Sequence, residues 1–157
     1  MLKANIKTNA KHIQKRYKRL QSKLPRLIDK GLLQAGFHLL EIIRTKTSKG
    51  LDYKGVPFAP YSEGYLKRLQ KEGKPTAVDL IYDNVMMGAL TPSMVKKTGK
   101  HKVTLAFARK EATDRAFFVQ VTTEPQRKFF GFNTRTEKII QRTFNKFVEK
   151  ELRKFKI

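Results

Sequence analysis

The chain has 157 residues, with 35 lysines and arginines against 13 aspartates and glutamates, and its formal net charge is +22 at pH 7. This length suits one domain with residues to spare for an arm. The absence of cysteine excludes disulfide bonds and thiolate metal sites, and it is natural for a protein made in a cytoplasm. No run of about 18 apolar residues occurs, so we expect no membrane-spanning helix.

The excess of positive charge predicts a polyanionic partner. Nucleic acid, an anionic membrane face or an acidic protein could each supply the opposite charge. A solvated basic surface that serves only solubility is the remaining alternative. Binding to nucleic acid through charge would weaken steeply with salt and would carry no base specificity.

Residues 1–23 are predicted to form a basic helical arm. Its apolar residues follow the spacings of a narrow amphipathic stripe, namely Ile6, Ile13, Tyr17, Leu20 and Leu24. Such a helix can lie on nucleic acid, on a membrane or on a protein partner. The candidate contacts with DNA or with an acidic partner are Lys11, Lys15, Arg16, Lys18 and Arg19.

A second helix is expected from about residue 25 to residue 47, with Ser22 as its cap and Pro25 in its first turn. Gly31 and Gly36 lie within its apolar pattern and favour the close approach of a neighbouring helix or sheet. Residues 48–62 are a loop interrupted by glycines and prolines. Ser62 then begins a short helix that ends at Gly73.

The remainder predicts a β-hairpin followed by a long helix. Residues 101–109 alternate apolar and polar side chains, and residues 116–124 are rich in β-forming residues, so the two segments pair as antiparallel strands. The last helix runs from about Thr134 to Phe155, capped by Asn133 or Thr134, with Glu137 at the capping-box spacing from Thr134. The expected fold is α+β: N-terminal helices, a small antiparallel sheet and a C-terminal helix packed on that sheet, in one domain spanning residues 24–157.

Residues 125–133, PQRKFFGFN, form an apolar elbow between the sheet and the last helix. Burying one phenylalanine ring is worth roughly 1.5–3 kcal/mol, so this run is costly to leave in water. We expect Phe129 and Phe130 to point in different directions, one ring into the core and the other toward a neighbouring subunit.

The side chains that catalysis requires do not gather in the sequence. His12, His38 and His101 are far apart, and no Gly-rich phosphate loop or nucleophile elbow occurs. The carboxylates that could pair for acid–base or metal chemistry fit no nuclease pattern; they are Glu63, Glu72, Asp79 and Asp83. We therefore expect a protein that is not an enzyme and has no metal or cofactor. A toxin or nuclease of mobile DNA is the weakest alternative.

Three segments, taken in order, resemble the bacteriophage virion morphogenesis and tail completion family. The first is GVPFAPYSEGYLK, in which the matching residues are Gly55, Pro57, Phe58, Pro60, Ser62, Tyr65 and Lys67. Phe58 stands where the family has tryptophan, and Tyr61 where it has leucine. The second is LIYDNVMMGALTPSM, matched at Asp83, Gly88, Leu90 and Ser93. The third is the Pro-x-Arg-x-Phe-x-Gly pattern of residues 125–131.

The resemblance implies a structural protein of the head–tail junction of a tailed phage, located in the neck of the virion. Such proteins commonly form a ring, often a hexamer, between the head connector or completion proteins and the tail tube or terminator proteins. Double-stranded DNA passes through the ring, so contacts with it must be weak and non-specific. A sequence-independent nucleic-acid-binding protein that uses the arm and the last helix is the alternative.

The candidate interface with a neighbouring subunit or partner follows from the matched segments. Aromatic and arginine side chains dominate the binding energy of protein interfaces. The candidates are Phe58, Tyr61, Tyr65, Arg127, Phe129 and Phe130. For Phe58 and Tyr61 the alternative is that they only hold the loop against their own domain.

Overall fold

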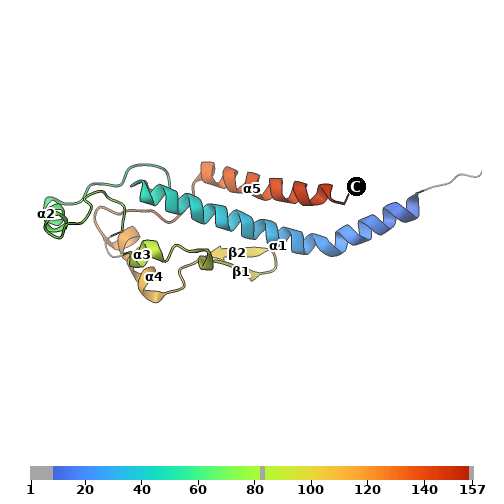
Figure 1. Cartoon of the computed structure of the whole chain (residues 1–157), viewed down its shortest axis with the longest axis horizontal. Helices are drawn as coiled ribbons and strands as arrows, with labels where there is room; N and C mark the ends of the chain where they lie inside the picture. Colours follow the sequence, from blue (N-terminus) through green and yellow to red (C-terminus); the bar gives the residue numbers. More distant parts are fainter. Residues whose placement is uncertain (1–8, 82–83, 156–157) are drawn as a thin grey trace, which may run out of the picture.

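The computed structural model describes residues 9–81 and 84–155. A single long helix, α1 (Ala10–Ser48), runs through most of the molecule. The C-terminal helix α5 (Thr134–Arg153) lies along one side of α1, and a two-stranded sheet lies on the other side (Figure 1). This confirms the predicted α+β class. The prediction that the last helix packs on the sheet is wrong, because α1 lies between them.

The helix α1 is continuous across the point where two helices were expected. Ser22 does not cap a new helix; its hydroxyl donates to the carbonyl of Arg19 within α1. Pro25 lies inside the helix, where it removes one backbone hydrogen bond and favours a kink. Figure 1 shows α1 changing direction in its blue N-terminal part. The described part of the arm and the helix expected over residues 25–47 are therefore one continuous helix.

Two glycines of α1 allow α5 and the sheet to pack closely against its opposite sides. A Cβ atom at Gly31 would lie 2.9 Å from the Phe144 ring of α5, and one at Gly36 would lie 2.7 Å from Val95 of the sheet. Real Cβ atoms essentially never make contacts this short, so a larger residue at either position would force the neighbouring side chain to shift. The close approach predicted for these two positions is confirmed.

The hairpin consists of β1 (Val95–Gly99) and β2 (Lys102–Leu105), which pair antiparallel. A hairpin was predicted between residues 101–109 and 116–124: the strand in the first segment is confirmed by β2, but its partner is β1. Residues 116–124 are not a strand: they belong to α4 (Lys110–Phe117) and to a π-helical turn at Phe118–Thr122. Ala112 and Ala116 are buried and Val119 is half-buried, and this helical spacing prevails over the β preference of the residues between them.

The shorter elements gather at the end of α1 opposite the N-terminal arm (Figure 1). The helix α2 (Glu63–Lys71) begins at the predicted cap, since the Ser62 hydroxyl accepts from the Tyr65 amide at 3.4 Å. The helix α3 (Val85–Gly88) and a 3-10 turn (Pro92–Met94) precede β1. For α5, Asn133 and not Thr134 is the cap, with its side-chain oxygen 2.9 Å from the Thr136 amide.

Candidate subunit interface and basic arm

The three segments of the family resemblance pack together at this end of the molecule. Phe58, Leu90 and Phe129, one from each segment, share a single buried cluster. The Tyr53 amide, just before the first segment, donates to the carbonyl of Lys128 at 3.0 Å. Asp83, the first matched residue of the second segment, lies outside the described residues.

Arg127 fastens the first segment to the third. Its side chain is 9% exposed, and one terminal nitrogen, Nη2, donates to the carbonyls of Ala59 and Pro60, at 3.2 Å each. The guanidinium carbon lies 4.9 Å from the centre of the Tyr61 ring, a distance typical of a cation–π contact. Within the described part of the chain, the buried Nε of Arg127 has no hydrogen-bond partner.

A cavity of about 680 Å³ opens beside this arginine. Tyr61, Tyr65 and Arg127, three of the candidate interface residues, line it together with apolar residues that include Met86, Phe118 and Val119. The Tyr61 and Tyr65 rings meet edge to face, with 4.8 Å between their centres. Burial, then the nearby Tyr65 and Asp79, raise the pKa of Tyr61, while Arg127 acts in the opposite direction. We call this cavity the aromatic groove.

The surface next to the aromatic groove is unusually apolar. Phe117, Phe118 and Val121 are 60%, 56% and 50% exposed. They lie on α4 and the π-helical turn, and π-helical turns occur frequently at functional sites. Contiguous exposed apolar patches of this kind are typical of protein interaction sites, whereas single exposed apolar residues are ordinary. The sequence pattern did not reveal these residues, because their β-forming composition predicted a strand over residues 116–124.

The three phenylalanines among the candidate interface residues have different environments. Phe58 is 8% and Phe129 is 0% exposed, and both belong to the core of the single chain. Phe130 is half-buried, and its ring centre lies 5.6 Å from that of Phe107. The inward direction predicted for one ring of the pair is thus confirmed for Phe129. With its ring fully buried, Phe129 offers no surface to a neighbouring subunit in this structure. That Phe130 contacts a neighbouring subunit stays a prediction.

The described part of the basic arm, residues 9–23, lies at the other end of the molecule, and the predicted arm residues 1–8 lie outside the described residues. Lys11, Lys15, Lys18 and Arg19 are exposed. Arg16 is half-buried, and its guanidinium donates to the carbonyl of Phe155 through Nε at 3.1 Å and Nη2 at 2.9 Å. Arg16 therefore ties the arm to the end of α5, in addition to any contact with an external anion.

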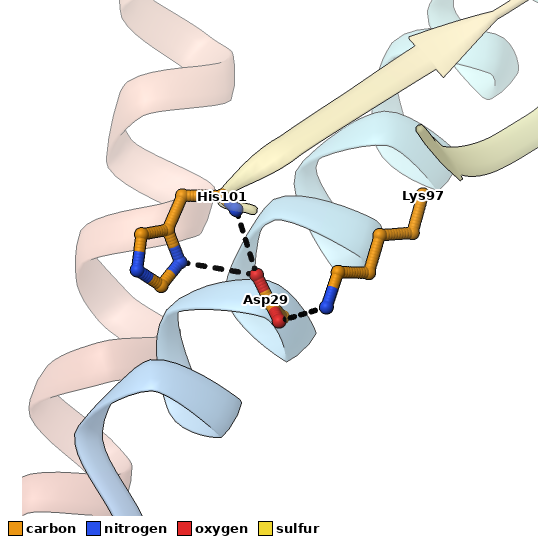
Figure 2. Close-up of polar contacts among 3 residues, drawn as sticks. All are labelled: Asp29, Lys97 and His101. Carbon is orange, nitrogen blue, oxygen red and sulfur yellow. Dashed lines mark hydrogen bonds and ion pairs between the residues drawn. The ribbon is translucent and has the colours of Figure 1, made fainter. Parts of the chain in front are cut away.

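One cluster of titratable side chains lies on the sheet side of α1. The Asp29 carboxylate accepts hydrogen bonds from Lys97, from the ring Nδ1 of His101 at 3.1 Å and from the His101 amide at 3.2 Å (Figure 2). Its contact with Lys97 is the main reason that the pKa of Asp29 is lowered. The cluster joins the turn of the hairpin to α1, and no bound group is needed to explain it.

Two of the three histidines link neighbouring elements. His101 contacts Asp29, and the His38 ring lies 2.7 Å from the Thr143 hydroxyl of α5. Among the described residues no group of three or more histidines and carboxylates could hold a metal ion. Over the same residues, no helix is long and apolar enough to cross a membrane.

Comparison with protein-family models, with curated proteins and with solved structures found no match.

Proposed function

We propose that the protein is a non-enzymatic structural component of a tailed-phage head–tail junction, which assembles as a homo-oligomeric ring between the head connector and the tail tube. The observation that carries this proposal is the packing of the three resemblance segments into one unit around Arg127 and Phe129. Residues that match a family pattern and also pack together are more informative than three isolated motifs.

The surface features favour contacts between subunits. The aromatic groove and the exposed Phe117 and Phe118 offer apolar area at one end of an elongated molecule, and the charged arm extends from the other end (Figure 1). A contact between the unlike ends of two copies would be head to tail, and such a contact closes into a ring when its rotation permits. The net charge of +22 then supplies weak attraction to DNA in transit.

A second candidate is a sequence-independent nucleic-acid-binding protein with no place in the virion. The exposed lysines of the arm favour it, because phosphate contacts need only accessible positive charge. The two candidates differ in where the protein acts, so the decisive experiment is made on phage particles.

Deletion of the gene from the phage is expected to yield complete heads and complete tails that do not join. Electron microscopy of the lysate checks this, and labelled protein should appear in the neck of complemented particles. Joined, infectious virions in the deletion would refute the proposal. The same virions, with tight DNA binding by the purified protein, would favour the second candidate.

A matched pair of variants tests the groove surface. Phe118 and Phe132 are 56% and 58% exposed, but of the two only Phe118 lines the aromatic groove. Each variant is supplied to the deletion phage. Phe132→Asp should restore the joining of heads to tails, whereas particles made with Phe118→Asp should remain unjoined. Equal behaviour of the two variants would argue against the groove as the contact surface.

A further inference from the structure

A line of basic side chains follows one face of the N-terminal half of α1. The residues recur at alternating spacings of four and three, in the order His12, Arg16, Arg19, Lys23, Arg26 and Lys30, and five of the six are lysine or arginine. Alternating spacings of four and three place residues on one face of an α-helix. At about 1.5 Å per residue, the line is about 27 Å long. We call it the cationic stripe.

The structure places the whole stripe along one cleft. A hollow of about 890 Å³ between α1 and the end of α5 is lined by all six residues of the stripe, together with Leu27, Glu151, Lys154 and Phe155. Among the described residues that line it, Glu151 is the only carboxylate, and it is paired with Lys154. The cleft is therefore strongly positive along its length.

Such a stripe is unfavourable for the isolated chain. Like charges three and four residues apart on a helix repel one another, and α1 has no acidic residue between Ala10 and Ile28. An external polyanion would remove this repulsion. Arg16 joins the cleft wall to the carbonyl of Phe155 and acts as a positioning residue, because it fixes the distance between the arm and α5.

We infer that the cationic stripe is a binding track for the phosphates of duplex DNA. Neighbouring cations on one helix face are about 5–6 Å apart at Cβ, so a line of them can face successive phosphates. Apolar side chains of this part of α1 are also exposed, namely Ile13, Tyr17 and Leu24, but by helical periodicity they lie on the face next to the stripe and none of them lines the cleft. Inside the cleft, Leu27 is buried and Phe155 is half-buried against the Lys23 ammonium, so the cleft itself offers cations and little apolar surface. The inference rests on the DNA passage proposed above and assigns it to particular residues.

This assignment differs from the arm residues chosen from sequence. Arg16 and Arg19 belong to the stripe, whereas Lys11, Lys15 and Lys18 do not line the cleft. The alternation of four and three was visible in the sequence. It was missed because the expected break before Pro25 divided the stripe between two helices.

Two triple variants with the same loss of charge test the track. One replaces Lys23, Arg26 and Lys30 by glutamine. The control replaces Lys138, Arg142 and Lys146, which are exposed on α5 and outside the cleft. Binding of the full-length proteins to a fluorescent duplex is measured by anisotropy over a range of sodium chloride concentrations.

The stripe variant should bind roughly 30-fold more weakly, about threefold per cation removed, and its salt slope should fall by about 3. The control should lose less than about fivefold, because charges farther than about 10 Å are largely screened at 0.1 M salt. Circular dichroism verifies that both variants fold, and Lys23→Arg with Lys30→Arg should bind as the parent does.

Equal losses of duplex affinity in the two triple variants would overturn the inference, since the net charge of the protein would then explain binding. Absence of binding by the parent at low salt would overturn it as well, and so would tighter binding to phosphatidylserine vesicles than to the duplex. Each of these results is obtained with purified protein. The neck proposal depends on particle imaging, so the two can fail separately.

Discussion

Asp29 is the residue that fixes the turn of the hairpin on α1. Its carboxylate accepts from Lys97 and twice from His101, and these contacts favour the charged form. Hydrogen bonds to a carboxylate and a nearby ammonium both lower its pKa, and the pKa of Asp29 lies below its ordinary value of 3.8, mainly because of Lys97. The link between the hairpin and α1 is therefore sensitive to acid.

Asp29→Asn should lower the melting temperature at neutral pH. A lowered pKa in the folded state means that the Asp29 carboxylate contributes stability above its unfolded pKa and loses that contribution as the pH falls through its folded pKa. The gap between the parent and Asp29→Asn should thus narrow below pH 3.8, the ordinary value for this group. Thermal melts from pH 7 to pH 2.5 measure it.

Asp114→Asn is the control, since Asp114 is exposed and has no ion pair among the described residues. The melting temperature of Asp114→Asn should stay close to that of the parent at every pH. A gap for Asp29→Asn that stays constant down to pH 2.5 would contradict the assignment, because the carboxylate charge would then not be its source.

At the scale of elements, the two glycines of α1 determine how close its neighbours lie. Glycine costs about 1 kcal/mol relative to alanine inside a helix, so an ordinary Gly→Ala change there is stabilising. At Gly36 the new Cβ atom would lie 2.7 Å from Val95 and 3.2 Å from Val103, both in the hairpin. Val95 is buried and β-branched, so it has little freedom to move.

Gly36→Ala should therefore destabilise the protein by up to about 2 kcal/mol, since an overpacking cost of about 1–3 kcal/mol is offset by a gain of about 1 kcal/mol in helix propensity. Urea denaturation measures the change. Gly64→Ala in α2 is the matched control, because nothing lies within 4 Å of its added Cβ; it should be neutral or slightly stabilising. A stabilised Gly36→Ala would show that the hairpin is not held against α1 as described.

Local signals predicted those elements whose ends are fixed by neighbouring residues. Ser62 and Asn133 cap α2 and α5 through contacts three residues away, and such contacts are visible in sequence. The segment around Phe117 and Phe118 was misassigned because its β-forming residues are exposed, while small alanines face the core. Arg127 joins the first segment to the third by hydrogen bonds to the carbonyls of residues 59 and 60. These partners are far away in the sequence, so residue spacing does not reveal the contact.

At the scale of the whole molecule, positive charge is unevenly compensated. The chain has 35 basic and 13 acidic residues, and the six-residue cationic stripe meets the single carboxylate Glu151 in its cleft, within the described part of the chain. Net self-repulsion of this kind destabilises a compact state. The same charge attracts phosphates. Salt should therefore affect folding and DNA binding in opposite directions.

The melting temperature of the free protein should rise as sodium chloride increases from about 0.01 M to 0.15 M, because the Debye length falls from about 30 Å to about 8 Å. A rise of roughly 2–4 °C is expected for each kcal/mol of repulsion that screening removes. Chloride is used because phosphate and sulfate would bind the stripe itself. Over the same range the duplex should bind progressively more weakly. Binding releases the salt cations condensed on DNA, and the free energy gained from this release falls as the salt concentration rises. A melting temperature that falls with salt would mean that attractive ion pairs, such as Asp29 with Lys97, outweigh the repulsion among the basic residues.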